Sequence, residues 1–168
     1  MPIADVSGVS PDAKNLDEFL QELLSRIESI YDSYSMPLPV RRYYTFGPPA
    51  IDCEQLVVSV LQMYLGAPGD QATEPRRCHD PRTVTLNITV SRAVPIAQPN
   101  GNPPSAQSIS DSTRVCAYDA WILMDSMNVL DVWGEGGNYG LGVISTIDFT
   151  PPEGGYQSVV MSVTMAVP

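Results

Sequence analysis

Apolar residues recur at spacings of three and four from Leu16 to Tyr34. This period is typical of an amphipathic helix with one buried stripe. Asn15, followed three residues later by Glu18, fits a capping box, so we expect the helix to begin at Asn15. Residues 1–14 lack the periodicity and are expected to form a flexible N-terminal arm. The apolar positions are Leu16, Phe19, Leu20, Leu23, Leu24, Ile27, Ile30, Tyr31 and Tyr34.

A second segment with helical periodicity spans about residues 105–132, and a Gly-rich run at residues 134–140 ends it. Asp119 and Asp125 lie on this helix. Carboxylates on a helix most often face water, so we expect both of them on a solvated face. The inner stripe consists of Cys116, Ala120, Leu123, Met127 and Leu130, widened by Ile109, Ile122 and Val129.

Five segments indicate β-strands: residues 40–46, 51–65 and 83–91, and two more near the end of the chain. The third and the last alternate most clearly between apolar and polar positions, which predicts one buried and one polar face. The apolar faces are Val84, Leu86, Ile88 and Val90 in the third strand and Val159, Met161, Val163, Met165 and Val167 in the last.

The segment 51–65 is apolar on both faces of an extended chain, which predicts a strand covered on both sides. Alternation places Val57, Leu61, Met63 and Leu65 on one face and Leu56, Val58, Val60 and Tyr64 on the other.

The order is therefore helix, three strands, helix, two strands. Strands and helices do not alternate regularly, which disfavours a doubly wound parallel sheet. We expect an α+β fold, with a mostly antiparallel sheet of about five strands and two helices packed on one face. With 168 residues, the chain suits a single domain, which we place at residues 15–168.

Composition argues against binding to nucleic acid. Nine Lys and Arg against nineteen Asp and Glu leave a net charge of −10. Stable binding to a polyphosphate depends on cations that release its counterions. Only 17% of the residues are charged, below the value of about 25% for soluble proteins, and this low share suggests that much of the surface becomes covered.

Arginine supplies almost all of the positive charge, because Lys14 is the only lysine. The planar guanidinium suits fixed contacts with carboxylates of a partner. Scattered surface arginines are the competing interpretation. The residues expected to contact partners are Arg41, Arg42, Arg76, Arg77 and Arg82.

Few residues indicate catalysis or metal binding. The single histidine, His79, follows Cys78 directly, and adjacent side chains of an extended segment diverge, which disfavours a Cys-His nucleophile pair. A zinc site would need Cys53, Cys78 and His79, with Asp52 as a further ligand, but only one tight ligand pair exists. A Cys53–Cys78 disulfide and reduced, packed thiols both stay open. We expect no enzyme, no cofactor and no metal.

No apolar run approaches the ~18 residues needed to cross a bilayer. A basic stretch followed by an apolar block, typical of a signal peptide, is not visible at the N-terminus either. We therefore expect synthesis in the cytoplasm, no membrane partner and mostly reduced cysteines.

The central block resembles tail terminator proteins of long-tailed, siphovirus-type phages that infect actinobacteria. The resemblance covers most of the chain from about residue 15, and its motifs are structural rather than chemical. The residues that carry it are the segment Asp52-Cys53-Glu54-Gln55-Leu56-Val57-Val58, then Gly66, Gly69, Cys78 and Pro81, and the strand end Ser91-Arg92-Ala93-Val94-Pro95.

The resemblance implies a virion protein that forms a six-membered ring at the head-proximal end of the tail tube after assembly in the host cytoplasm. The ring would stop tube polymerisation and contact the tail tube protein and the head-side connector. Genomic DNA would pass through the ring without specific binding, and an acidic lumen would reduce the attraction of DNA to its wall. The negative net charge is equally suited to keeping a monomer in solution. The expected contact elements are the N-terminal arm and the loops at residues 66–81 and 95–105.

Two alternatives stay open. The first alternative is another head-to-tail connector, a head-completion protein or a minor tail protein, because these proteins consist of the same kind of subunit. A small intracellular enzyme or ligand-binding domain would instead have a deep polar pocket between sheet and helices and would be a stable monomer.

Overall fold

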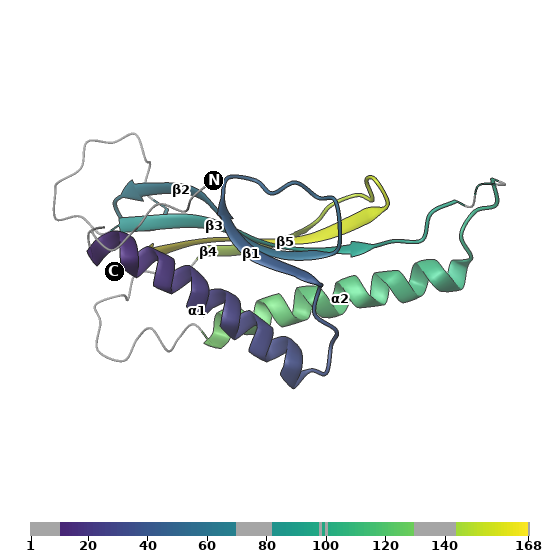
Figure 1. Ribbon diagram of the computed structural model, residues 1–168, viewed down its shortest axis with the longest axis horizontal. Coiled ribbons are helices and arrows are strands. Elements are labelled where there is room, and N and C mark those ends of the chain that lie inside the picture. The colour runs from purple at the N-terminus through teal and green to yellow at the C-terminus, as the bar shows by residue number, and fades with distance from the viewer. Residues whose placement is uncertain (1–10, 70–81, 98, 100, 130–143, 168) are drawn as a thin grey trace, which may run out of the picture.

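Five strands form one mixed, mostly antiparallel sheet in the order β1-β2-β3-β5-β4. The computed structural model describes residues 11–69, 82–97, 99, 101–129 and 144–167. Both helices lie on the same face of the sheet (Figure 1). The predicted α+β class and the predicted order of elements are confirmed. The elements are α1 (Pro11–Ser33), β1 (Arg41–Phe46), β2 (Gln55–Leu65), β3 (Arg82–Ala93), α2 (Ala106–Val129), β4 (Ile144–Phe149) and β5 (Tyr156–Val167).

Helix α1 begins at Pro11, so the prediction that it starts at Asn15 and that residues 11–14 belong to an arm is wrong. Proline is favoured at a first helical position, because its fixed φ suits the helix and its missing N–H would have no helical acceptor there. The capping-box pattern at Asn15 therefore lies inside the first turns. The arm at residues 1–10 lies outside the described residues.

The parallel pairing of β1 with β2 needs a crossover connection, whereas the other neighbouring strands pair antiparallel. Residues 47–54 make that connection on the side of the sheet away from the helices (Figure 1). The Gln55 side-chain amide donates a 2.7 Å hydrogen bond to the Ala50 carbonyl in this loop. The loop thereby lies against the N-terminal end of β2.

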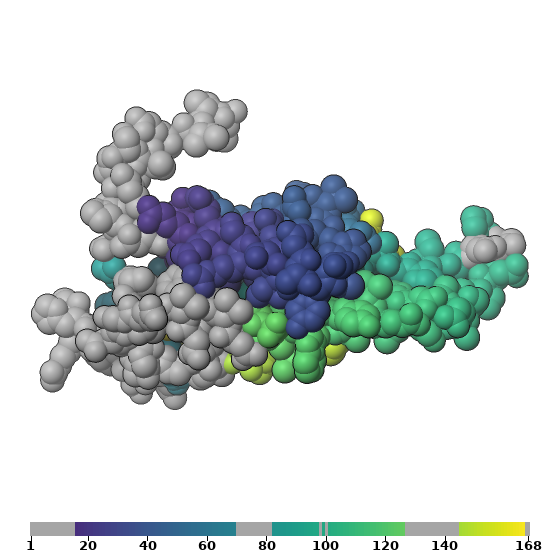
Figure 2. Space-filling model, turned by 90° about the horizontal axis from the view of Figure 1, so that it is seen from below, coloured from purple at the N-terminus to yellow at the C-terminus, as the bar shows by residue number. Residues whose placement is uncertain are grey.

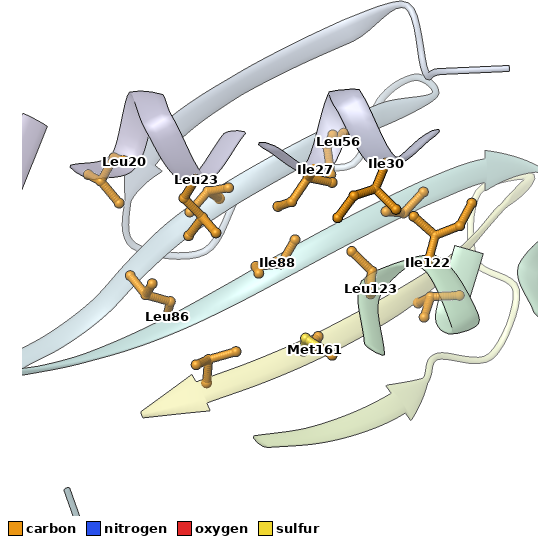
Figure 3. Packing of buried hydrophobic residues seen from close by; sticks show 14 of the residues in the cluster. Leu20, Leu23, Ile27, Ile30, Leu56, Leu86, Ile88, Ile122, Leu123 and Met161 are labelled. Carbon is orange, nitrogen blue, oxygen red and sulfur yellow. The ribbon is translucent and has the colours of Figure 1, made fainter. Parts of the chain in front are cut away.

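The hydrophobic core fills the space between the helices and the sheet. Side chains of α1 and α2 point toward the strands (Figure 3), and burying each large apolar side chain contributes roughly 1.5–3 kcal/mol. None of the helices in the described part of the chain is long and apolar enough to span a membrane. The members of the core that Figure 3 labels are Leu20, Leu23, Ile27, Ile30, Leu56, Leu86, Ile88, Ile122, Leu123 and Met161.

A bulge in β2 corrects the predicted faces of that strand. The register with β3 shifts between Val60 and Gln62, which leaves Leu61 as the extra residue. Met63 then stands opposite Val84 of the core face, while Tyr64 stands opposite a threonine. Beyond the bulge Met63 is therefore on the helix side and Tyr64 on the opposite side, the reverse of the expectation from strict alternation.

The face of the sheet away from the helices is lined mainly by hydroxyl and amide side chains, and we call it the hydroxyl face. One row of paired residues crosses all five strands, and in it the Ser162 hydroxyl donates to Asn87 Oδ1 at 2.9 Å. The buried Ser59 hydroxyl, in the same row, makes no hydrogen bond with the described residues. The row consists of Thr45, Ser59, Asn87, Ser162 and Thr146.

Candidate protein-interaction surface

The outer face of α2 carries large apolar side chains that nothing in the described structure covers. Trp121 is 60% exposed, and Tyr118 and Met124 are about half exposed. Ile109, expected in the inner stripe, is also half exposed, so that prediction is wrong. Cys116, Ala120, Ile122 and Leu123 form the inner stripe as predicted, and Leu130 and the side chains of Met127 and Val129 lie outside the described part.

A shallow groove between α2 and the end of α1 is lined by Tyr34, Arg114, Ala117, Tyr118 and Trp121. Its volume is about 350 Å³ and its lining is almost wholly apolar. Figure 2 shows the two helices side by side on this face of the molecule. Exposed aromatic side chains next to an arginine are typical of protein–protein contact sites. We call this surface the α2 patch, which consists of Tyr34, Arg114, Ala117, Tyr118, Trp121 and Met124.

A buried ion pair holds α2 in position beneath the patch. Arg92 of β3 donates two hydrogen bonds of 2.9 Å, from Nε and Nη2, to the two carboxylate oxygens of Asp119. Arg92 Nη2 also donates to the Pro37 carbonyl at 2.8 Å, and the Tyr31 hydroxyl donates to Asp119 Oδ1 at 2.7 Å. The network therefore ties α1, the segment after it, β3 and α2 together.

Asp119 is fully buried, so the expectation of a solvated face is wrong for this residue. The sequence pattern of the helix could not show this burial, because it contains no information about Arg92, the distant residue that pairs with Asp119. Asp125 is half-buried and accepts a 3.1 Å hydrogen bond from the Tyr34 hydroxyl at the rim of the patch. Asp125 is therefore partly accessible to solvent, in agreement with the expected solvated face.

The electrostatics of the network follow from burial. Burial, followed by the charge of Asp119, raises the pKa of Tyr31 well above its ordinary value of 10.0. Burial by itself would lower the pKa of Arg92, but the hydrogen bonds and charge of Asp119 outweigh it and raise that pKa. Arg92 and Tyr31 therefore both stay protonated. Burial likewise raises the pKa of the Cys116 thiol, which makes it an inert core residue.

The N-terminal part of α2 projects away from the rest of the molecule. Ser105 caps it by accepting a 3.1 Å hydrogen bond from the Ser108 backbone N–H. This end of α2 and the chain that leads into it extend beyond the strands (Figures 1 and 2). Ile96, in the same projection, is 67% exposed. We call residues 94–97, 99 and 101–109 the projecting arm; they include part of the loop at 95–105 expected to contact partners.

The arginines singled out from the sequence do not converge on one site. Arg41 lies on the edge strand β1 and pairs with Asp52 at 2.9 Å, with its guanidinium 5.0 Å from the centre of the Tyr43 ring. Arg42 pairs with Glu28 of α1 at 3.2 Å. Arg82 begins β3 and is exposed. Their contacts with partners stay predictions, and Arg76 and Arg77 lie outside the described residues.

Cys53 forms no disulfide with another described cysteine, and its Sγ lies 3.9 Å from Arg41 Nη1 and 4.0 Å from Gln55 Oε1. Cys78 and His79 lie outside the described residues, so the pairing of Cys53 with Cys78 stays a prediction. Within the described ranges, no three His, Cys, Asp or Glu side chains are grouped to hold a metal ion.

No protein-family model and no curated protein sequence matches this chain. The α2 patch therefore has to be interpreted from its own geometry. Sequence inspection missed it, because Tyr118, Trp121 and Met124 at spacings of three are as typical of a core stripe as of an interface. The structure decides between the two, because Asp119 is on the buried side of α2 and these three residues are on the exposed side.

Proposed function

We propose that this protein is a ring-forming tail terminator, which caps the head-proximal end of a phage tail tube and joins it to the head connector. The observation that carries the proposal is the α2 patch, whose exposed Trp121 stands over a shallow apolar groove. Contiguous exposed apolar surface of this kind is typical of protein-interaction sites. It is also consistent with the resemblance of the central block to terminators.

The projecting arm supports the same function. A segment that extends beyond its own sheet buries little within the subunit and is available to a neighbour along the tail axis. Together, the arm and the α2 patch provide the contacts with the tail tube protein and the head connector. Capping then follows from the difference between the two faces of the ring. One face matches a tube subunit and binds the tube end, whereas the other face does not, so no further tube subunit can add.

The accessible part of the hydroxyl face suits the wall of a channel for DNA; in its central row Thr146 is exposed and Thr45, Asn87 and Ser162 are half-buried, whereas Ser59 is buried. This row contains serine, threonine and asparagine, and no lysine or arginine. Stable binding to DNA phosphates depends on such cations. A wall of this composition therefore lets the genome pass with little retention, and the net charge of −10 acts in the same direction.

The test is electron microscopy of tail tubes assembled with and without this protein. We expect tubes of uniform length with a ring at one end in its presence, and tubes of unregulated length in its absence. Tubes that are unregulated and unmarked in both preparations would rule out the terminator role. A ring found only at the head portal would instead identify a head-side connector protein.

A further inference from the structure

Two edges of the sheet, β1 and β4, have no further strand beside them in the described part of the chain. Each is six residues long. Edge strands present unpaired backbone N–H and C=O groups, which are a template for pairing with another chain. A neighbour that covers both edges has to match each of them in length, direction and charge.

The directions of the two strands match each other. Strand β1 runs parallel to β2, and each later step across the sheet, from β2 to β3, β5 and β4, reverses direction. β1 and β4 are therefore antiparallel. If a second copy adjoins the first with its helices on the same side, β4 of one copy meets β1 of the next as an antiparallel pair, the commoner kind of ladder.

The charges at the two edges are opposite and lie on the same face. Arg41 pairs with Gln55 in the register of β1 and β2, and Asp148 pairs with Val160 in that of β4 and β5, which places both on the hydroxyl face. Asp148 is exposed. Arg41 contacts Asp52, but both side chains of this pair are more than half exposed, and such a pair holds the arginine weakly.

Each edge also carries one exposed phenylalanine on the helix side of the sheet. Phe46 stands opposite Val60, and Phe149 stands opposite Val159, so both phenylalanines lie on the core side of the sheet. They are nevertheless 68% and 55% exposed. Pairing of the two edges would place these apolar side chains beside a neighbouring subunit instead of water.

We propose that β4 of one copy pairs antiparallel with β1 of a second copy, with Asp148 contacting Arg41 of that copy. The inference rests on the ring-forming function proposed above and names the surface through which the ring closes. The partner is a second copy because each edge complements the other in length, direction and charge. Such a head-to-tail contact uses two different surfaces and is repeated around a ring.

The test is sedimentation of the full chain over a range of concentrations, with the variants Arg41→Asp and Asp148→Arg. The wild type should form a species larger than a dimer. Each single variant places like charges at every interface and should weaken association by roughly tenfold or more.

Mixing the two variants should restore assembly. In a 1:1 mixture, interfaces between an introduced aspartate and an introduced arginine alternate with interfaces between the native Arg41 and the native Asp148. Every interface then joins opposite charges. The double variant, in which the two charges are exchanged within one chain, should assemble by itself for the same reason.

Asp52→Asn is the matched control, because it removes the partner of Arg41 within the subunit and leaves both edges unchanged. It should assemble like the wild type. The proposal is overturned if the wild type is monomeric throughout, if the single variants assemble normally, or if the mixture yields only dimers. Rings that depend on these charges but leave tube length unregulated would keep the edge pairing and reject the terminator function.

Discussion

Arg92 and Asp119 are the two residues whose burial says most about this fold. Each is nearly or fully inaccessible, at 5% and 0% exposure, and each would be costly to bury without the other. Their two hydrogen bonds, with those from Tyr31 and to Pro37, satisfy the charges between α1, β3 and α2. The pair and the apolar stripe of α2 therefore lie on the core side of that helix, whereas Trp121 faces outward.

Asp119→Asn leaves the Arg92 guanidinium buried without a compensating charge. We expect a loss of about 3–5 kcal/mol in the free energy of unfolding, measured by urea denaturation. Asp125→Asn, on the same helix at the rim of the α2 patch, is the matched control and should cost less than about 1 kcal/mol. Equal losses in the two variants would contradict a special role for the buried pair.

Tyr31 predicts how stability depends on alkaline pH. Its pKa is raised in the folded state, first by burial and then by the charge of Asp119, so above a pH of about 10 the unfolded chain loses this proton while the folded chain retains it. Its contribution to stability is thus present below the unfolded pKa of about 10 and is lost as pH rises further. Unfolding free energies between a pH of about 8 and about 11 should fall more steeply for the wild type than for Tyr31→Phe.

The control for that measurement is Tyr118→Phe, which removes an exposed hydroxyl outside the buried network. It should keep the slope of the wild type. If Tyr31→Phe also keeps that slope, the buried hydroxyl does not control the alkaline limit of stability.

Helix α2 has two sides that differ in burial among the described residues. Its inner side packs on the sheet through Cys116, Ala120, Ile122 and Leu123, whereas its outer side presents the α2 patch. A helix that is apolar on both sides is normally buried on both. The outer side of α2 is exposed among the described residues, so under the proposed function a partner would cover it.

Substituting Trp121 separates this binding role from folding. Trp121→Ala should change the free energy of unfolding by no more than about 0.5 kcal/mol, because the side chain is mostly exposed. It should nevertheless abolish control of tube length in the microscopy assay, since a central exposed aromatic residue often dominates an interface. Ser110→Ala, at an exposed position of the same helix, should keep normal tube length. Normal length with Trp121→Ala would exclude the patch from capping.

The molecule as a whole is a sheet with one apolar and one polar face, two unpaired edges and an arm beyond one end, within the described ranges. Each of these surfaces would be covered or used differently in a ring. The helices shield the apolar face within the subunit, the edges β1 and β4 match one another, and the hydroxyl face offers few cations to DNA.

Local patterns in the chain were enough to predict the order of elements and the class of the fold. Periodicity showed the buried stripe of α1 and the alternation of β3 and β5, because these patterns depend on residues a few positions apart. The bulge at Leu61 escaped this reasoning, since a single extra residue leaves an apolar strand apolar and only the register with β3 shows the change of face. The helix start at Pro11 was missed because a second capping pattern lay within the first turns.

Which residues meet could be learned only from the folded chain. Asp119 and Arg92 are 27 positions apart and Tyr31 and Asp119 are 88 apart, and nothing in the local pattern marks them as partners. The same holds for the edges, because the insertion of β5 between β3 and β4 places β1 and β4 at opposite ends of the sheet. Local patterns tell which side of an element is buried, whereas contacts between distant segments determine what buries it and which surfaces remain for partners.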